Sequence, residues 1–182
     1  MDLKQLQALF IEAKRLTGHT DFVVIGSLSI LGIVQENSQI PERMLMSIDV
    51  DCYTKADPER IFDLEGALGA GSSFYEENGY YLDPVSPRLP TLPDRWPHRL
   101  VEVELEERIT LHFLDPNDAA VSKYARCDVR DREWIRAGLD AGLLSAPIIK
   151  SRFRETAFLD AAERERAWKA LTEDASPPPG LR

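Results

Sequence analysis

The chain contains little cysteine, little histidine and no long hydrophobic run. Its 182 residues include two cysteines, Cys52 and Cys127, and three histidines. Two cysteines are too few for a disulfide framework, and their spacing does not match a zinc knuckle. No apolar segment approaches the roughly 20 residues of a membrane helix, and the amino terminus lacks a secretory signal pattern. We therefore expect a cytoplasmic protein with no membrane partner and no structural disulfide.

Positive charge is also scarce. The chain has 22 Lys and Arg against 31 Asp and Glu, so its formal net charge is -9. An acidic surface repels polyanions, which mildly disfavours RNA and mildly favours a cationic substrate. Basic residues concentrate only at 126–132 and 150–154. These two stretches could form one wall of a groove, or they could be solvated helix faces balanced by neighbouring acids.

The first 70 residues alternate between helical and strand-like patterns. The expected elements, in chain order, are a helix over 2–17, a strand over 21–25, a helix over 28–35 capped by Ser27, a strand over 44–53, and a helix from 57 to about 68. Each strand is short and is followed by a turn or a helix. This order is typical of a sheet with helices packed on it.

The remaining residues continue with strands and then become helical. We expect short strands at 74–75 and 79–82 around an Asn78-Gly79 turn, a proline-rich loop over 84–97, and antiparallel strands over 99–105 and 109–114. Helices should follow over 116–126, capped by Asp115, over 128–141 and within 147–173. The pattern predicts an α+β protein. Its sheet part covers 1–114, its helical carboxyl-terminal region covers 115–174, and a disordered tail covers 175–182.

Two short motifs carry the chemical information. Gly26-Ser27 follows an apolar strand and opens a helix, where backbone N–H groups and a hydroxyl can receive phosphate oxygens. Asp49 and Asp51 lie two positions apart on the next strand, so their carboxylates share one face at about 7 Å along the strand. Carboxylate oxygens are the ligands that Mg²⁺ prefers. Each motif is common alone, and their combination in this order is far more specific.

The combination resembles the nucleotidyltransferase superfamily of the DNA-polymerase-beta type, whose motif is Gly-Ser at a helix start followed by Asp-x-Asp on a strand. Residues 114–123 and the pair Arg130-Asp131 are similar to segments of minimal bacterial nucleotidyltransferases related to AbiE-type toxin components. The resemblance covers about residues 20–135. It implies a mixed sheet flanked by helices, with a helical carboxyl-terminal half.

The resemblance also implies roles for particular residues. Asp49 and Asp51 would bind Mg²⁺ or Mn²⁺, Gly26 and Ser27 would position the phosphates of a nucleoside triphosphate, and Lys123 would reach the triphosphate and neutralise its charge. The alternative for Lys123 is an exposed helix residue that pairs with Asp118 or Asp131.

A third carboxylate usually completes such a site. Asp83 follows Tyr80-Tyr81-Leu82 on the expected next strand and is the first candidate for a metal ligand and base. Glu102 and Glu104 alternate on one face of a later strand and are the other candidates. The sequence leaves this choice open.

The implied activity is transfer of a nucleoside monophosphate to an acceptor hydroxyl. The acceptor could be an RNA end such as that of tRNA, a protein side chain or a small molecule, and a toxin paired with an antitoxin is the first biological hypothesis. The alternative is a degenerate, non-catalytic member of the superfamily that acts as a binding or regulatory module.

Overall fold

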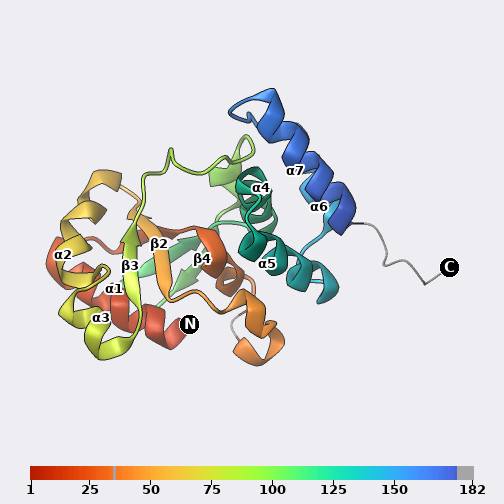
Figure 1. Ribbon diagram of the computed structural model, residues 1–182. Helices are drawn as coiled ribbons and strands as arrows, with labels where there is room; N and C mark the ends of the chain where they lie inside the picture. Colours follow the sequence, from red (N-terminus) through yellow and green to blue (C-terminus); the bar gives the residue numbers. More distant parts are fainter. Residues whose placement is uncertain (35, 176–182) are drawn as a thin grey trace.

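A five-stranded mixed sheet forms the centre of the amino-terminal half (Figure 1). The computed structural model describes residues 1–34 and 36–175. The strands are β1 (Asp21–Val24), β2 (Asp49–Thr54), β3 (Tyr81–Pro84), β4 (Val101–Glu104) and β5 (Thr110–Phe113). Their order is β3-β2-β1-β5-β4, with β1/β5 and β2/β3 parallel and the other neighbours antiparallel. The expected antiparallel pair at β4 and β5 is confirmed.

The two faces of this sheet differ in chemistry because successive side chains in a strand alternate. Phe22 lies on the buried face, where its ring meets Phe10 of helix α1 (Leu3–Thr17) at a centroid distance of 4.8 Å. Phe22 and Cys52 are fully buried. Asp49 and Asp51 alternate with Val50 and Cys52 and therefore project from the opposite face.

Helical elements account for most of the rest of the described chain. They are η1 (Gly26–Gly32), η2 (Asn37–Gln39), η3 (Glu42–Met44), η4 (Pro58–Leu64), α2 (Glu65–Leu68), α3 (Ser73–Asn78), η5 (Trp96–Arg99), η6 (Glu106–Arg108), α4 (Pro116–Arg126), α5 (Val129–Asp140), α6 (Ala146–Arg154) and α7 (Ala161–Asp174). The α+β class is confirmed. Among the described residues, no helix is long and apolar enough to cross a membrane.

Two expectations around the Gly-Ser motif are wrong. The helix there is the short 3₁₀ helix η1, which starts at Gly26, and Ser27 does not cap it. The Ser27 hydroxyl instead accepts a hydrogen bond from Lys123, because tertiary packing brings α4 against this turn. The strand expected over 44–53 begins only at Asp49, since Glu42–Met44 forms the 3₁₀ turn η3 that leads into it.

The strand expected at 74–75 is also wrong. This segment is helix α3, whose first turn is capped by the Ser72 hydroxyl through the Tyr75 N–H. Asn78-Gly79 ends the helix, with Gly79 in the left-handed conformation at φ 76°, and does not form a hairpin turn. A glycine after a helix and a glycine in a hairpin both need positive φ, so the dipeptide alone could not separate the two.

The proline-rich loop links the sheet to the carboxyl-terminal helices. We call residues 85–95 the strap, because this segment leaves β3 and crosses to the helical half (Figure 1). Its Asp94 N–H donates to the Glu155 carbonyl at 2.8 Å, and Pro93 bridges to Thr156. Asp115 caps α4, as expected. The tail expected over 175–182 lies, apart from Ala175, outside the described residues.

Candidate active site

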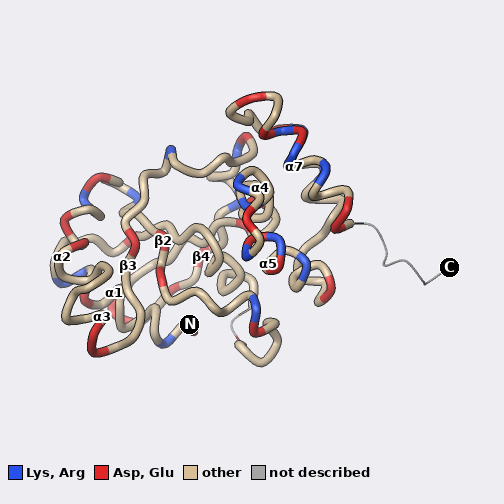
Figure 2. Tube along the Cα trace, viewed as in Figure 1, with Lys and Arg blue, Asp and Glu red and all other residues tan. Residues whose placement is uncertain are grey.

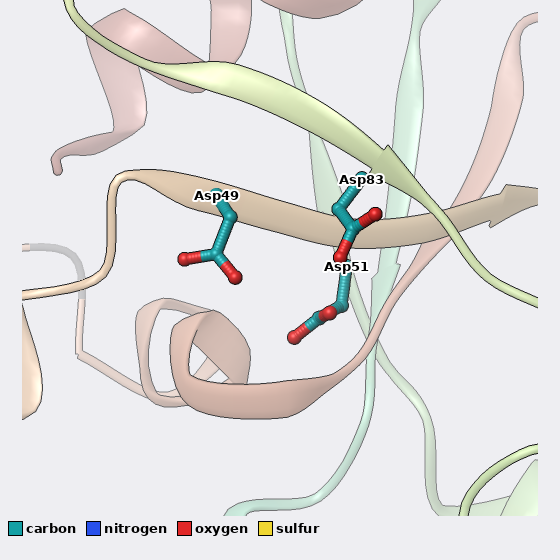
Figure 3. Close-up of side chains that lie close together, drawn as sticks. All are labelled: Asp49, Asp51 and Asp83. Atoms are coloured by element: carbon teal, nitrogen blue, oxygen red, sulfur yellow. The ribbon is translucent and has the colours of Figure 1, made fainter. Parts of the chain in front are cut away.

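Three carboxylates from two adjacent strands converge on one face of the sheet. Ligand oxygens of Asp49, Asp51 and Asp83 all lie within 4.8 Å of one another. The parallel register of β2 and β3 places Asp51 directly beside Asp83. Figure 3 shows the three side chains pointing to the same side of these strands. We call these three residues the acid cluster.

The other candidates for the third carboxylate lie elsewhere. Glu102 and Glu104 are on β4, at the sheet edge opposite β3. The Glu102 carboxylate lies 3.2 Å from Nδ1 of His112, whose Nε2 is 3.1 Å from Asp21. Asp83 is therefore the residue that the fold brings to Asp49 and Asp51. Its chemical role stays a prediction.

The acid cluster is electrostatically strained. Burial, together with the neighbouring charges of Asp49 and Asp83, raises the pKa of Asp51 to about 7. Burial and the charge of Asp49, with a further contribution from Glu65, also raise the pKa of Asp83. Like charges held at this distance favour a proton or a cation, so the cluster has a high affinity for positive charge.

Two neighbours fix the geometry of the cluster. The Ser47 hydroxyl donates to Asp49 Oδ1 at 2.7 Å and orients that carboxylate. Gly26, at φ 70°, lies so close to Asp51 that a Cβ there would collide with Asp51 Oδ2. The Gly-Ser turn therefore needs its glycine for close approach to a carboxylate as well as for its positive φ.

Lys123 extends from α4 to the Gly-Ser turn. Its ammonium group donates to Ser27 Oγ at 3.0 Å and to Asp131 Oδ1 at 2.7 Å, and it lies 5.0 Å from the centre of the Trp134 ring. The side chain is 4% exposed. Burial lowers the pKa of Lys123, and the Asp131 carboxylate opposes that effect. Lys123 thus pairs with Asp131, as its alternative reading expected, but in a buried position at the Gly-Ser turn.

Sequence reasoning missed two residues of this region. Trp134, on α5, donates its indole N–H to the Ser27 carbonyl at 3.2 Å across 107 positions of sequence, and no local signal could have predicted that contact. Ser47 stands two positions before Asp49, and the alternation of an extended chain could have placed it near that carboxylate.

Two cavities meet at Lys123. The Asp51 cavity, of about 690 Å³, lies between Asp51, the strap, α4 and the connection between α6 and α7. The Asp49 cavity, of about 540 Å³, lies between Ser27, Asp49 and α5. Lys123 lines both, so molecules in the two cavities would meet beside the acid cluster.

The mixed sheet carries both features on which the resemblance to nucleotidyltransferases rests, the Gly-Ser turn and the clustered aspartates. Residues 4–174 match the model of a family described as "nucleotidyltransferase of unknown function (DUF6036)". The chain belongs to this family. No curated protein and no solved structure matches it significantly. The expected nucleotidyltransferase class is thus confirmed, whereas similarity to AbiE-type toxins stays a prediction.

Proposed function

We propose that the protein is a metal-dependent enzyme that transfers a nucleoside monophosphate from a nucleoside triphosphate to an acceptor hydroxyl. The observation that carries this proposal is the convergence of Asp49, Asp51 and Asp83 within 4.8 Å on one sheet face. Three like charges are costly together without a cation. A merely structural role gives no reason to gather them.

The donor set fits a hard divalent cation, Mg²⁺ or Mn²⁺. All three side chains offer carboxylate oxygen, and the raised pKa values of Asp51 and Asp83 mark a site short of positive charge. Asp49 and Asp51 would be the principal ligands. When bound, the ion would stabilise the charge that develops on the phosphate oxygens during transfer.

Other residues of the chain would have separate roles in the transfer reaction. The acceptor oxygen attacks the α-phosphorus and forms the new P–O bond, the bond from that phosphorus to the bridging oxygen breaks, and pyrophosphate leaves. Asp83 takes the proton of the acceptor hydroxyl. The Ser27 hydroxyl and the Lys123 ammonium group hold the β- and γ-phosphates, where Lys123 offsets their charge.

The biological setting follows only from the resemblance to toxin-type enzymes. On that basis a toxin that acts on tRNA or a protein, with a partner antitoxin, is the hypothesis to test first. Mixing the protein with each labelled nucleoside triphosphate, Mg²⁺ and total cell extract, followed by separation of RNA, protein and small molecules, would identify both substrates.

Asp49→Asn is the matched control, because it removes one proposed ligand at nearly constant volume. Label transfer by the parent protein and none by Asp49→Asn would support the proposal. A parent protein that neither transfers label nor gains thermal stability from Mg²⁺ with any nucleoside triphosphate would instead be a non-catalytic binding module.

A further inference from the structure

The two cavities beside the acid cluster differ in chemistry. The charged and hydroxyl side chains that line the Asp49 cavity are Ser27, Ser47, Arg43, Lys123, Arg130, Asp49 and Asp131. The Asp51 cavity has a largely apolar wall, made by Val85, Leu89, Leu92, Phe158 and Leu159. Polyphosphate suits the first lining. The second combines this apolar wall with charged groups from Asp51, Arg88, Lys123, Arg126 and Glu163, and such a combination is typical of sites for small organic ligands.

The apolar wall is built from two segments that are tied together. The strap is joined to the end of α6 by the Asp94–Glu155 backbone hydrogen bond and the Pro93–Thr156 bridge. The connection that follows α6 is fixed by the Leu159 N–H, which donates to Glu163 Oε2 at 2.7 Å. A cavity of about 690 Å³ between such walls matches a small organic molecule, not a folded macromolecule.

The side chains that line the Asp51 cavity carry more positive than negative charge, although the chain as a whole is negatively charged. Figure 2 shows acidic segments on β2 and β3 and basic segments on α4. Of the two acids that line the cavity, Asp51 belongs to the acid cluster and Glu163 is engaged by a backbone N–H. Lys123 and Arg126 both pair with Asp131. Arg88 has no ion-pair partner within residues 1–34 and 36–175, and so it remains available to an anion.

We infer that the Asp51 cavity binds the acceptor, and that the acceptor is a small molecule with an apolar body, a reacting hydroxyl and an anionic group that pairs with Arg88. The inference rests on the proposed nucleotide transfer, and it replaces the tRNA or protein acceptor of the toxin hypothesis with a small molecule. The Asp51 side chain lines this cavity, and Asp83 lies beside Asp51 in the strand register, two positions before Val85 of the cavity wall, so a ligand in this cavity lies next to the acid cluster. The negative charge of the whole chain favours a cationic acceptor, whereas the charges inside this cavity favour an anion.

Two probes with the same aromatic body, 6-hydroxy-2-naphthoate and its neutral carboxamide, test the inference. Each is titrated into the full chain in the presence of Mg²⁺, and its affinity is measured by calorimetry. We expect the carboxylate to bind up to about fivefold more tightly, which is the upper range for one ion pair with an exposed side chain such as Arg88. Arg88→Gln should abolish this preference. Arg95→Gln, which removes the same charge from the strap outside both cavities, should retain it.

Occupying the cavity gives an independent measurement. Ser122→Phe places a ring in the cavity from α4 and should abolish binding of both probes. Ser151→Phe, on the exposed surface of α6, should leave binding unchanged. Equal binding of the two probes to the parent protein, or retention of binding by Ser122→Phe, would overturn the inference.

Nucleotide binding separates this inference from the proposed function. Stabilisation by Mg²⁺ with a nucleoside triphosphate should survive in Ser122→Phe, because Ser122 lines the Asp51 cavity and does not line the Asp49 cavity, to which the phosphates are assigned. If Ser122→Phe lost a stabilisation that the parent shows, the cavity would belong to the nucleotide, and only the acceptor assignment would fall. A parent protein without any response to Mg²⁺ and nucleotide would remove the proposed function and the acceptor assignment with it.

Discussion

The acid cluster gathers charges of the same sign, whereas the buried ion pair of Lys123 joins charges of opposite sign. Asp49, Asp51 and Asp83 are like charges on neighbouring strands, and burial and mutual repulsion raise the pKa of Asp51 to about 7. Lys123, in contrast, is neutralised by Asp131, which Arg126 also contacts at 2.9 Å.

The acid cluster leaves its charges unpaired for a cation, whereas Asp131 orients Lys123 at the Gly-Ser turn, where the proposed triphosphate would bind. A buried ion pair such as Lys123–Asp131 fixes the position of both side chains, and removing one partner leaves the other as an unpaired buried charge. An uncompensated cluster lowers stability until a cation arrives. Replacing one aspartate of the acid cluster with asparagine should therefore stabilise the metal-free protein. Replacing Asp131 with asparagine should destabilise it.

The largest effect is expected for Asp51→Asn. Removing a principal ligand should lower the rate of nucleotide transfer about 10³-fold or more, since the ion supplies several kcal/mol of charge stabilisation. The same variant should melt at a higher temperature than the parent in EDTA, because one repelling charge is gone. A label-transfer assay and a thermal melt test both effects. Reduced stability without metal would contradict the interpretation of the cluster.

Asp83→Asn should have the next largest effect. The loss of a general base should lower transfer roughly 10²- to 10³-fold, while stabilisation by Mg²⁺ and nucleotide should largely remain because Asp49 and Asp51 retain the ion. Single-turnover rates and thermal shifts measure the two quantities. Near-normal transfer by Asp83→Asn, with loss in Glu102→Gln, would move the role of base to β4.

Asp131→Asn tests the contribution of the buried Lys123–Asp131 ion pair to stability. It leaves Lys123 buried without its carboxylate partner, so we expect a loss of roughly 2–4 kcal/mol in the free energy of unfolding. Asp63→Asn is the control, because its ion pair with Arg60 is exposed on both sides and should contribute less than about 1 kcal/mol. Urea denaturation of the two variants gives the values. If the two substitutions lowered the free energy of unfolding equally, the buried Lys123–Asp131 pair would contribute no more to stability than an exposed ion pair.

The last prediction concerns the pH dependence of stability. The pKa of Asp51 is raised in the folded state from 3.8 to about 7, so the folded state binds the proton more tightly than the unfolded state does. The resulting stability is fully present below pH 3.8 and is lost as the pH rises through about 7. In EDTA, the melting temperature of the parent relative to Asp51→Asn should therefore fall by several degrees between pH 4 and pH 8. An unchanged difference would mean that Asp51 is not strained.

Local sequence pattern determined the elements that depend on neighbouring residues. The alternation of Asp49, Val50 and Asp51 predicted two carboxylates on one strand face, and Asp115 before Pro116 predicted the start of α4. The same reasoning failed at Asn78-Gly79, because a helix end and a hairpin turn require the same backbone conformation there. Short-range rules report the allowed conformations of a segment, not the partner that it meets.

The tertiary structure alone decided which residues complete the site. Parallel pairing of β2 with β3 places Asp83 beside Asp51, and the sheet order carries Glu102 and Glu104 to the opposite edge. Lys123 meets Ser27 across 96 positions, and Trp134 meets it across 107. Such contacts arise when packing of the sheet and helices buries apolar surface, a global quantity that no short motif encodes. The sequence thus predicted the aspartate pair, the Gly-Ser turn and Lys123, and it left Asp83, Glu102 and Glu104 as candidates for the third carboxylate. Packing placed Asp83 beside the pair, buried Lys123 against Asp131 and formed both cavities.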